Sequence, residues 1–309
     1  MNATPETVVE ISNLVKAYGD VKAVNAISLS VTKGEVFGML GPNGAGKTTT
    51  VEIIEGLRTA DSGTVRLLGM DVSRDVRAVK ERIGVQSQQP ALFPKLTVQE
   101  TVNFFRSLYK KSIPASDIIK LAALEESRRV LYQNLSGGQQ QRLSVALAFV
   151  NDPDVIFLDE PTTGLDPQAR RAMWEVVNNF HRTGKTVFLT THYMEEAERL
   201  CDRVAIMDHG NIIALDSPQR MIEHYIKESV IQFKMTNYPG EEALTNLTGV
   251  TKAVKEGDEI ILYTSNIPSA ISALLDLASA KSSELSELVV RQATLEDVFL
   301  KLTGKRIRD

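Results

Sequence analysis

Short apolar runs followed by polar turns recur through the first two thirds of the chain. Residues 36–40, 155–158 and 186–190 are mostly apolar and too short for helices, which is typical of strands buried on both faces of a parallel sheet. Residues 8–14 and 27–31 alternate or run apolar and predict antiparallel strands. The same signals predict further strands, at residues 64–68, 83–86, 203–207 and 212–215.

Helical periodicity occupies the segments between these strands. A helix is predicted over residues 48–56, directly after the first buried strand, and another over residues 169–183, where Gly184 can end it. Residues 98–149 are mostly helical, with one break at Pro114. Strands that alternate with helices in this way predict an α/β fold.

The last part of the chain has a different order of elements. Its predicted strands and helices follow the order βαββαβ, which suggests a small ferredoxin-like sandwich. Thr294 is expected to cap the last helix, with Asp297 at the capping-box position. This part shows no paired carboxylates, histidine cluster or glycine loop, so we assign it no chemistry. We therefore expect two domains, residues 1–227 and 228–309.

Composition narrows the class of protein. A chain of 309 residues can form two domains that each bury a core, and the net charge of −4 does not favour a nucleic-acid partner. Cys201 is the single cysteine, which suits a reducing compartment. No stretch approaches the ~18 apolar residues of a membrane span. The first residues lack the basic and apolar regions of a secretory signal, so we expect none.

A glycine-rich loop follows the first buried strand. GPNGAGKTT, residues 41–49, fits the pattern G-x-x-x-x-G-K-[ST] and lies between a predicted strand and a predicted helix. In such a loop the backbone amides cradle phosphates, Lys47 reaches the outer phosphates and the Thr48 hydroxyl ligates Mg²⁺. The residues expected to bind the nucleotide here are Gly41, Pro42, Asn43, Gly44, Ala45, Gly46, Lys47, Thr48 and Thr49.

Two carboxylates stand at the end of the second buried strand, in VIFLDEP. Ligand chemistry in open α/β sheets lies beyond the carboxyl ends of the strands. Asp159 is placed to hold the Mg²⁺ shell, and Glu160 is placed to orient or polarise a water for attack on the γ-phosphorus. A solvated acidic turn would explain this segment on its own, but it is the weaker interpretation after a phosphate loop.

A second phosphate-facing loop is predicted in LSGGQQQR, residues 135–142. Ser136 can cap the helix that follows, and Gln139 can complete a capping box. Gly137 and Gly138 allow close approach to the first N–H groups, and a helix N-terminus favours anions. A single phosphate loop would indicate only that the chain is a nucleotide hydrolase of unspecified class. Two such loops on one chain indicate a more specific class of hydrolase.

With these motifs in this order, the chain resembles the nucleotide-binding subunit of ATP-binding-cassette (ABC) transporters over roughly residues 8–225. GPNGAGKTT matches the Walker A loop, VIFLDEP matches Walker B and LSGGQQQR matches the family signature. The resemblance implies a P-loop ABC ATPase core, in which a mixed sheet is joined by an antiparallel β subdomain and an inserted helical subdomain at about residues 90–150. The tail, ending in ATLEDVFLKLTG, is similar to that of drug-resistance and antibiotic-export ATPases.

The resemblance also assigns roles to single residues. Tyr18, in VKAYGD, would stack on adenine, and Asp166 lies in the D-loop GLDP. His192, in LTTHYMEEAE, would contact the γ-phosphate and act in hydrolysis with Glu160 and Lys47.

A glutamine that ligates Mg²⁺ and senses the membrane partner is also implied, and Gln88 matches it. The sequence does not settle which glutamine takes this position, because Gln86 and Gln89 lie close to Gln88. Ser87 stands where a proline is common in the family.

The implied cofactors are ATP and Mg²⁺, and the implied partner is a second copy of the chain. In the family, the signature loop of one cassette binds the γ-phosphate of ATP held by Walker A of the other, which gives a head-to-tail ATP sandwich. The pore would be a separate transmembrane permease, docked near the aromatic-rich residues 91–111, with the chain peripheral at the cytoplasmic face of the cell membrane.

The favoured function is that of an exporter ATPase for drugs, antibiotics or other small lipophilic molecules. An importer motor is the nearest alternative, because the cassette itself does not distinguish the two. A non-transport ATPase acting on the ribosome or DNA is the other alternative. It is less favoured because the chain has one cassette, no long coiled coil and an acidic balance.

Overall fold

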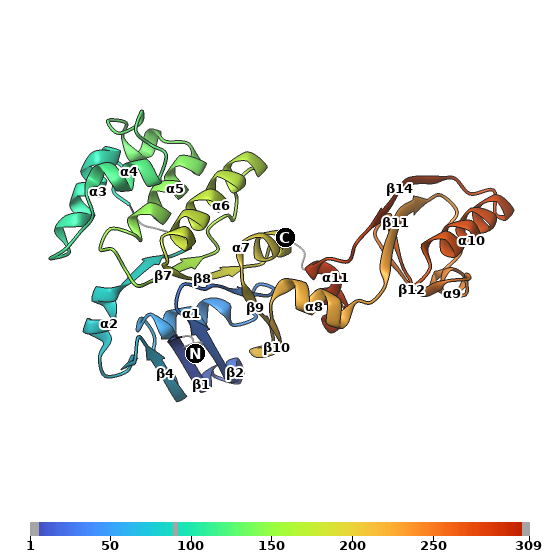
Figure 1. The fold of residues 1–309 in the computed structure, drawn as a ribbon, viewed down its shortest axis with the longest axis horizontal. Helices are drawn as coiled ribbons and strands as arrows, with labels where there is room; N and C mark the ends of the chain where they lie inside the picture. Colours follow the sequence, from blue (N-terminus) through green and yellow to red (C-terminus); the bar gives the residue numbers. More distant parts are fainter. Residues whose placement is uncertain (1–5, 89–91, 305–309) are drawn as a thin grey trace, which may run out of the picture. The chain divides into compact units, whose positions relative to one another are not determined.

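The computed structural model describes residues 6–88 and 92–304, and the chain forms two compact units that divide after residue 218. The sequence predicts the boundary at 227/228, after the helix that begins at Pro218. In the structure this helix, α8 (Pro218–Tyr225), groups with the second unit. In Figure 1 the first unit is coloured from blue to yellow and the second from gold to red.

A six-stranded sheet in which only one edge strand is antiparallel forms the centre of the first unit. The strand order is β10-β9-β3-β8-β7-β6, with β10 as the antiparallel edge. Every residue of β3, β7 and β8 is buried, as their apolar runs predict. The strands are β3 (Val36–Leu40), β6 (Ile83–Gln86), β7 (Val155–Asp159), β8 (Thr186–Thr191), β9 (Arg203–Asp208) and β10 (Asn211–Asp216).

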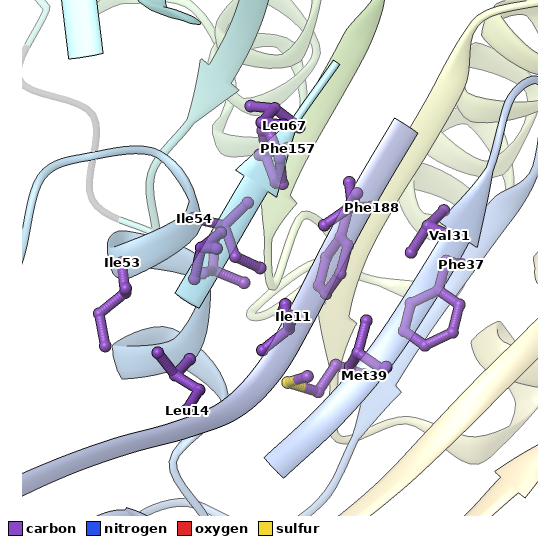
Figure 2. Close-up of a cluster of buried hydrophobic side chains, with 14 of the residues drawn as sticks. Ile11, Leu14, Val31, Phe37, Met39, Ile53, Ile54, Leu67, Phe157 and Phe188 are labelled. Carbon is purple, nitrogen blue, oxygen red and sulfur yellow. The ribbon is translucent and has the colours of Figure 1, made fainter. Parts of the chain in front are cut away.

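An antiparallel sheet, in the order β2-β1-β4-β5, packs over the parallel one. Figure 2 shows the shared core: Ile11 and Leu14 come from the antiparallel sheet, Phe157 and Phe188 from the parallel sheet, and Ile54 from helix α1. This cluster fixes α1, and the loop before it, against the carboxyl ends of the parallel strands. The elements are β1 (Thr7–Tyr18), β2 (Val21–Thr32), β4 (Ser62–Leu67), β5 (Met70–Asp71) and α1 (Lys47–Ile54).

The helices α3, α4 and α5 have an apolar core of their own, and Figure 1 shows them grouped together. Helix α3 begins with a capping box between Thr97 and Glu100. Residues 98–149 are less helical than predicted, because Ala123 adopts the left-handed conformation (φ 52°) just beyond α4, and turns follow it. The elements are α3 (Val98–Ser107), α4 (Ala115–Leu121), a 3₁₀ turn (Tyr132–Asn134) and α5 (Gly137–Leu147).

Three more helices complete the description of the first unit. Helix α2 (Val76–Arg82) was not predicted, because it buries only Val79 and so has little apolar periodicity. Helix α6 (Pro167–Arg182) begins earlier than predicted, and α7 (Met194–Leu200) follows β8. No helix in the described ranges is long and apolar enough to cross a membrane.

The second unit has the predicted order of elements after α8. Its sheet is antiparallel in the order β12-β13-β11-β14, the arrangement of a ferredoxin-like sandwich. Thr294 and Asp297 form the predicted capping box at the last helix. The elements are β11 (Ser229–Met235), α9 (Glu241–Thr245), β12 (Val250–Glu256), β13 (Glu259–Thr264), α10 (Ile267–Ala280), β14 (Leu285–Arg291) and α11 (Leu295–Thr303).

Candidate nucleotide site

The loop between β3 and α1 is a tight backbone turn that glycine makes possible. Gly46 has φ 105°, and a Cβ there would lie 2.0 Å from the carbonyl oxygen of Ala23. A Cβ at Gly41 would lie 2.2 Å from the carbonyl oxygen of Met207. Lys47 is buried, its Nζ donates to the Gly41 carbonyl at 2.8 Å, and burial lowers its pKa. The other predicted loop residues lie on the same turn or at the start of α1: Pro42, Asn43, Gly44, Ala45, Thr48 and Thr49.

Two buried carboxylates lie at the end of β7, facing this loop. Asp159 accepts hydrogen bonds from the hydroxyls of Thr190 and, at 3.3 Å, Thr48. Burial raises the pKa of Asp159. Glu160 has φ 48°, a left-handed conformation that costs a non-glycine residue about 1–2 kcal/mol. Backbone strain of this kind is concentrated at functional sites.

The Glu160 carboxylate is the point where the predicted residues meet. Its Oε1 lies 3.4 Å from Lys47 Nζ, and its Oε2 lies 3.2 Å from His192 Nδ1. The same Oε2 accepts hydrogen bonds from Gln88 Nε2 at 3.3 Å and from Thr163 Oγ1 at 3.1 Å. The imidazole of His192, and then the charge of Lys47, lower the pKa of Glu160 to about 2. The carboxylate is therefore ionised at any physiological pH.

Geometry distinguishes Gln88 from Gln86. The side chain of Gln86 is buried, and its Nε2 donates to the Ser87 carbonyl at 2.6 Å instead of reaching the carboxylates. Gln89 lies outside the described residues, as do Pro90 and Ala91. Of the two described glutamines, only Gln88 hydrogen-bonds Glu160.

The second predicted loop opens onto a cavity. Ser136 caps α5 and forms the predicted capping box with Gln139, so the N-terminal turn is fixed. A cavity of about 700 Å³ lies against this turn. Its lining comes from the signature, the D-loop and the first turns of α6, and includes Ser136, Gly137, Gly138, Gln139, Gly164 and Asp166. None of the residues around this cavity belongs to the loop of residues 41–49.

Asp166 is also the N-cap residue of α6, a role that the sequence analysis did not predict. Its carboxylate caps α6, accepting hydrogen bonds from the N–H groups of Gln168 and Ala169, both at 2.9 Å. The missed signal was present, because an Asp directly before a proline is a common helix start.

Tyr18 lies at the end of β1 and is 43% exposed. The Lys16 ammonium and the Arg58 guanidinium lie 5.6 and 5.4 Å from its ring centre. The ring is therefore a partly accessible aromatic surface with two cations nearby.

The site combines a glycine-rich phosphate loop with an Asp–Glu pair at the end of a strand in a mainly parallel sheet. These features define a P-loop nucleotide hydrolase. The glycine-rich start of α5 is typical of a narrower class within these hydrolases. The family model described as ABC transporter matches residues 24–163. A protein named Nod factor export ATP-binding protein I, from Burkholderia orbicola, is 41% identical over 97% of this chain and 98% of its own length. The protein of the same name from Sinorhizobium fredii is 38% identical over 98% of this chain and 88% of its own.

Solved structures agree on the first unit. A dimeric ATP-binding cassette in a post-hydrolysis state, bound to ADP and Pi, is 28% identical with a TM-score of 0.62, over 68% of this chain and 98% of its own. The protein cbiO1 of Clostridium perfringens, part of an ABC transporter complex, is 27% identical with a TM-score of 0.64, over 71% of this chain and 91% of its own. The chain belongs to the ABC transporter family as an ATP-binding subunit, and it is an ATP hydrolase.

Proposed function

We propose that this chain energises export through a separate membrane-spanning permease, working as a head-to-tail pair of cassettes. Relatives named for export match it along nearly its whole length, including the second unit. The main support for this pairing is that the phosphate loop and the signature do not line a common cavity. The cavity at the signature has no lining residue from the phosphate loop. Each molecule would supply one wall of each of two ATP sites.

The phosphate loop and its surroundings would bind ATP and Mg²⁺. The backbone N–H groups of residues 41–49 and the Lys47 ammonium would hold the phosphates, and Tyr18 would stack on adenine. The hydroxyl of Thr48 and the carboxylate of Asp159, 3.3 Å apart, are the hard oxygen donors that Mg²⁺ prefers, and Gln88 adds an amide oxygen. When bound, the ion neutralises charge on the phosphates.

Hydrolysis would use the pair Glu160 and His192. The ionised Glu160 carboxylate, 3.2 Å from His192, would accept a hydrogen bond from the attacking water and orient it towards the γ-phosphorus. His192 would donate a hydrogen bond to the γ-phosphate and so stabilise charge there. Lys47, which now contacts Glu160, would transfer its interaction to the phosphates.

The signature would complete the site of the partner molecule. The capped N-terminus of α5 presents free backbone N–H groups and a positive dipole end beside the cavity, which favours a γ-phosphate. A Cβ added at Gly137 would meet no neighbouring atom of the described residues within 4 Å, so the approach there is open. Asp166, in the same lining, would meet the partner at the shared boundary.

The Ser136→Arg substitution tests this pairing. The arginine side chain would fill the cavity, so we expect near-normal ATP binding by the isolated chain and loss of hydrolysis. The matched control is Ser116→Arg, an exposed serine on α4, which we expect to leave the rate unchanged. Full hydrolysis by Ser136→Arg, or by a chain that stays monomeric with ATP, would contradict the proposal.

The permease would dock on exposed aromatic residues before and within α3. Phe93 and Phe104 are 48% and 40% exposed, and their rings meet edge to face at 5.1 Å. Leu108 is exposed beyond them. Exposed apolar clusters of this kind mark interaction sites. Docking here would hold the chain peripherally at the cytoplasmic face of the cell membrane.

A further inference from the structure

A buried carboxyl group behind the hydrolytic pair has no part in the roles proposed above. Glu196, on α7, has no exposed surface. Its Oε1 accepts a hydrogen bond from the Trp174 indole at 3.3 Å, whereas its Oε2 has no hydrogen-bond partner within the described residues. Burying a carboxyl group with incomplete hydrogen bonding is costly. A group of this kind therefore calls for a physical explanation.

Three separate segments face this carboxyl group. Burial raises the pKa of Glu196, and the hydroxyls of Thr191 and Thr162, the Trp174 indole and the charge of Arg170 act against that effect. Thr191 ends β8, Thr162 lies in the loop after β7, and the other two residues are on α6. The Oγ1 of Thr162 also lacks a hydrogen-bond partner within the described residues. Two buried groups without a hydrogen-bond partner in the described residues, this hydroxyl and the Glu196 Oε2, therefore lie where the same segments meet.

Two of these segments, the end of β8 and the loop after β7, lead directly to the hydrolytic residues. Thr191 immediately precedes His192, and its hydroxyl accepts a hydrogen bond from the Tyr193 N–H at 2.9 Å. Thr162 immediately precedes Thr163, whose hydroxyl donates to Glu160. The carboxyl group of Glu196 thus lies where the histidine segment and the glutamate segment converge.

We propose that Glu196 is a positioning residue for ATP hydrolysis: its carboxyl group holds the Thr162 loop against the Thr191–His192 segment and so sets the contact between His192 and Glu160. The inference rests on the hydrolytic roles proposed for those two residues. Glu196 does not touch the nucleotide and acts through its two threonine neighbours. A displacement of about 1 Å in catalytic groups can cost roughly a hundred-fold in rate.

The test compares Glu196→Leu and Glu196→Gln in the full chain with MgATP. Leucine fills the space but forms no hydrogen bond, so we expect kcat to fall by about ten- to a hundred-fold with KM changed by less than about two-fold. The glutamine side chain of the second variant can accept from Trp174 and donate to the hydroxyls. We therefore expect kcat of this variant within about three-fold of the wild-type value. The matched control is Glu195→Gln, on the same helix with a side chain 59% exposed, which should leave kcat unchanged.

Wild-type kcat in a folded Glu196→Leu protein overturns the proposal, and so does a Glu196→Gln protein as slow as the leucine variant. If Glu196→Leu fails to fold, Thr162→Val removes one hydroxyl at constant volume, and we expect the same loss of kcat without a change in KM. Unchanged kcat in Thr162→Val would then overturn the proposal. Glu160→Gln separates the two claims, because wild-type turnover in that variant refutes the hydrolytic roles themselves, whatever Glu196 does.

Discussion

Replacing Glu160 by glutamine removes one negative charge at the meeting point of the site while keeping its size. The carboxylate lies within 3.4 Å of Lys47 Nζ and 3.2 Å of His192 Nδ1. Loss of a positioned general base typically lowers a rate by about 10²- to 10⁴-fold, which corresponds to roughly 3–5 kcal/mol of barrier. Since glutamine keeps the space for ATP, we expect kcat to fall by this amount with little change in ATP affinity.

The same substitution has a predictable pH dependence in the nucleotide-free protein. The folded pKa of Glu160, about 2, lies below its ordinary value of 4.5. Its ionic contacts therefore stabilise the fold above about pH 4.5, by at most about 3 kcal/mol, and this contribution is lost as the pH falls towards 2. Wild type should be the more stable protein at pH 7, and the difference from Glu160→Gln should shrink on acidification through that window.

Phosphate release under saturating MgATP measures the first effect, and urea unfolding at several pH values measures the second. Glu175→Gln is the matched control, because it removes an exposed charge from the same unit. ATP should also hold the Glu160→Gln protein as a dimer in size-exclusion chromatography. Turnover within about three-fold of wild type would refute the role of Glu160, because a positioned base contributes far more.

Three further predictions concern other parts of the chain. Tyr18→Ala should weaken ATP binding by about ten-fold, as loss of a stacked base does, whereas Tyr18→Phe should bind normally in isothermal titration. Phe93→Asp should reduce co-purification with the permease while ATP binding stays normal, and Phe93→Leu should assemble. Asp297→Asn should destabilise the second unit by about 3 kcal/mol in urea unfolding, because the buried Asp297 carboxylate forms an ion pair at 2.6 Å with the partly exposed Arg291.

Each of these predictions has a distinct contrary result. ATP binding unchanged in Tyr18→Ala would remove Tyr18 from the adenine site. If Phe93→Asp lost both ATP binding and assembly with the permease, the substitution would have damaged the fold and not only a docking surface. An Asp297→Asn protein with wild-type unfolding would show that the ion pair between Arg291 and Asp297 contributes little net stability.

Local patterns carried most of what could be predicted. The Walker A loop and the strand before Asp159 are encoded by neighbouring residues, so a single sequence predicts both. The capping box of Ser136 and Gln139 is likewise local, and the structure confirms it.

What escaped prediction depends on distant contacts or weak periodicity. Thr190 supports Asp159 across 31 residues of sequence, and no motif marks such a pair. Helix α2 buries a single residue and so carries no apolar face to detect. The contact of Gln88 with Glu160 is also one that local sequence does not show: of the two described glutamines only Gln88 reaches that carboxylate, and Gln89 lies outside the described residues.

The claim that two molecules share each ATP site is tested most directly by mixing two inactive variants. Lys47→Ala should disable the phosphate loop and Ser136→Arg the signature, so each protein alone should not hydrolyse ATP. In a head-to-tail heterodimer, the intact phosphate loop of one chain meets the intact signature of the other and completes one of the two sites. Random pairing makes half of the dimers mixed, so the mixture should recover up to about a quarter of wild-type turnover. A mixture as inactive as its two components would contradict the shared site.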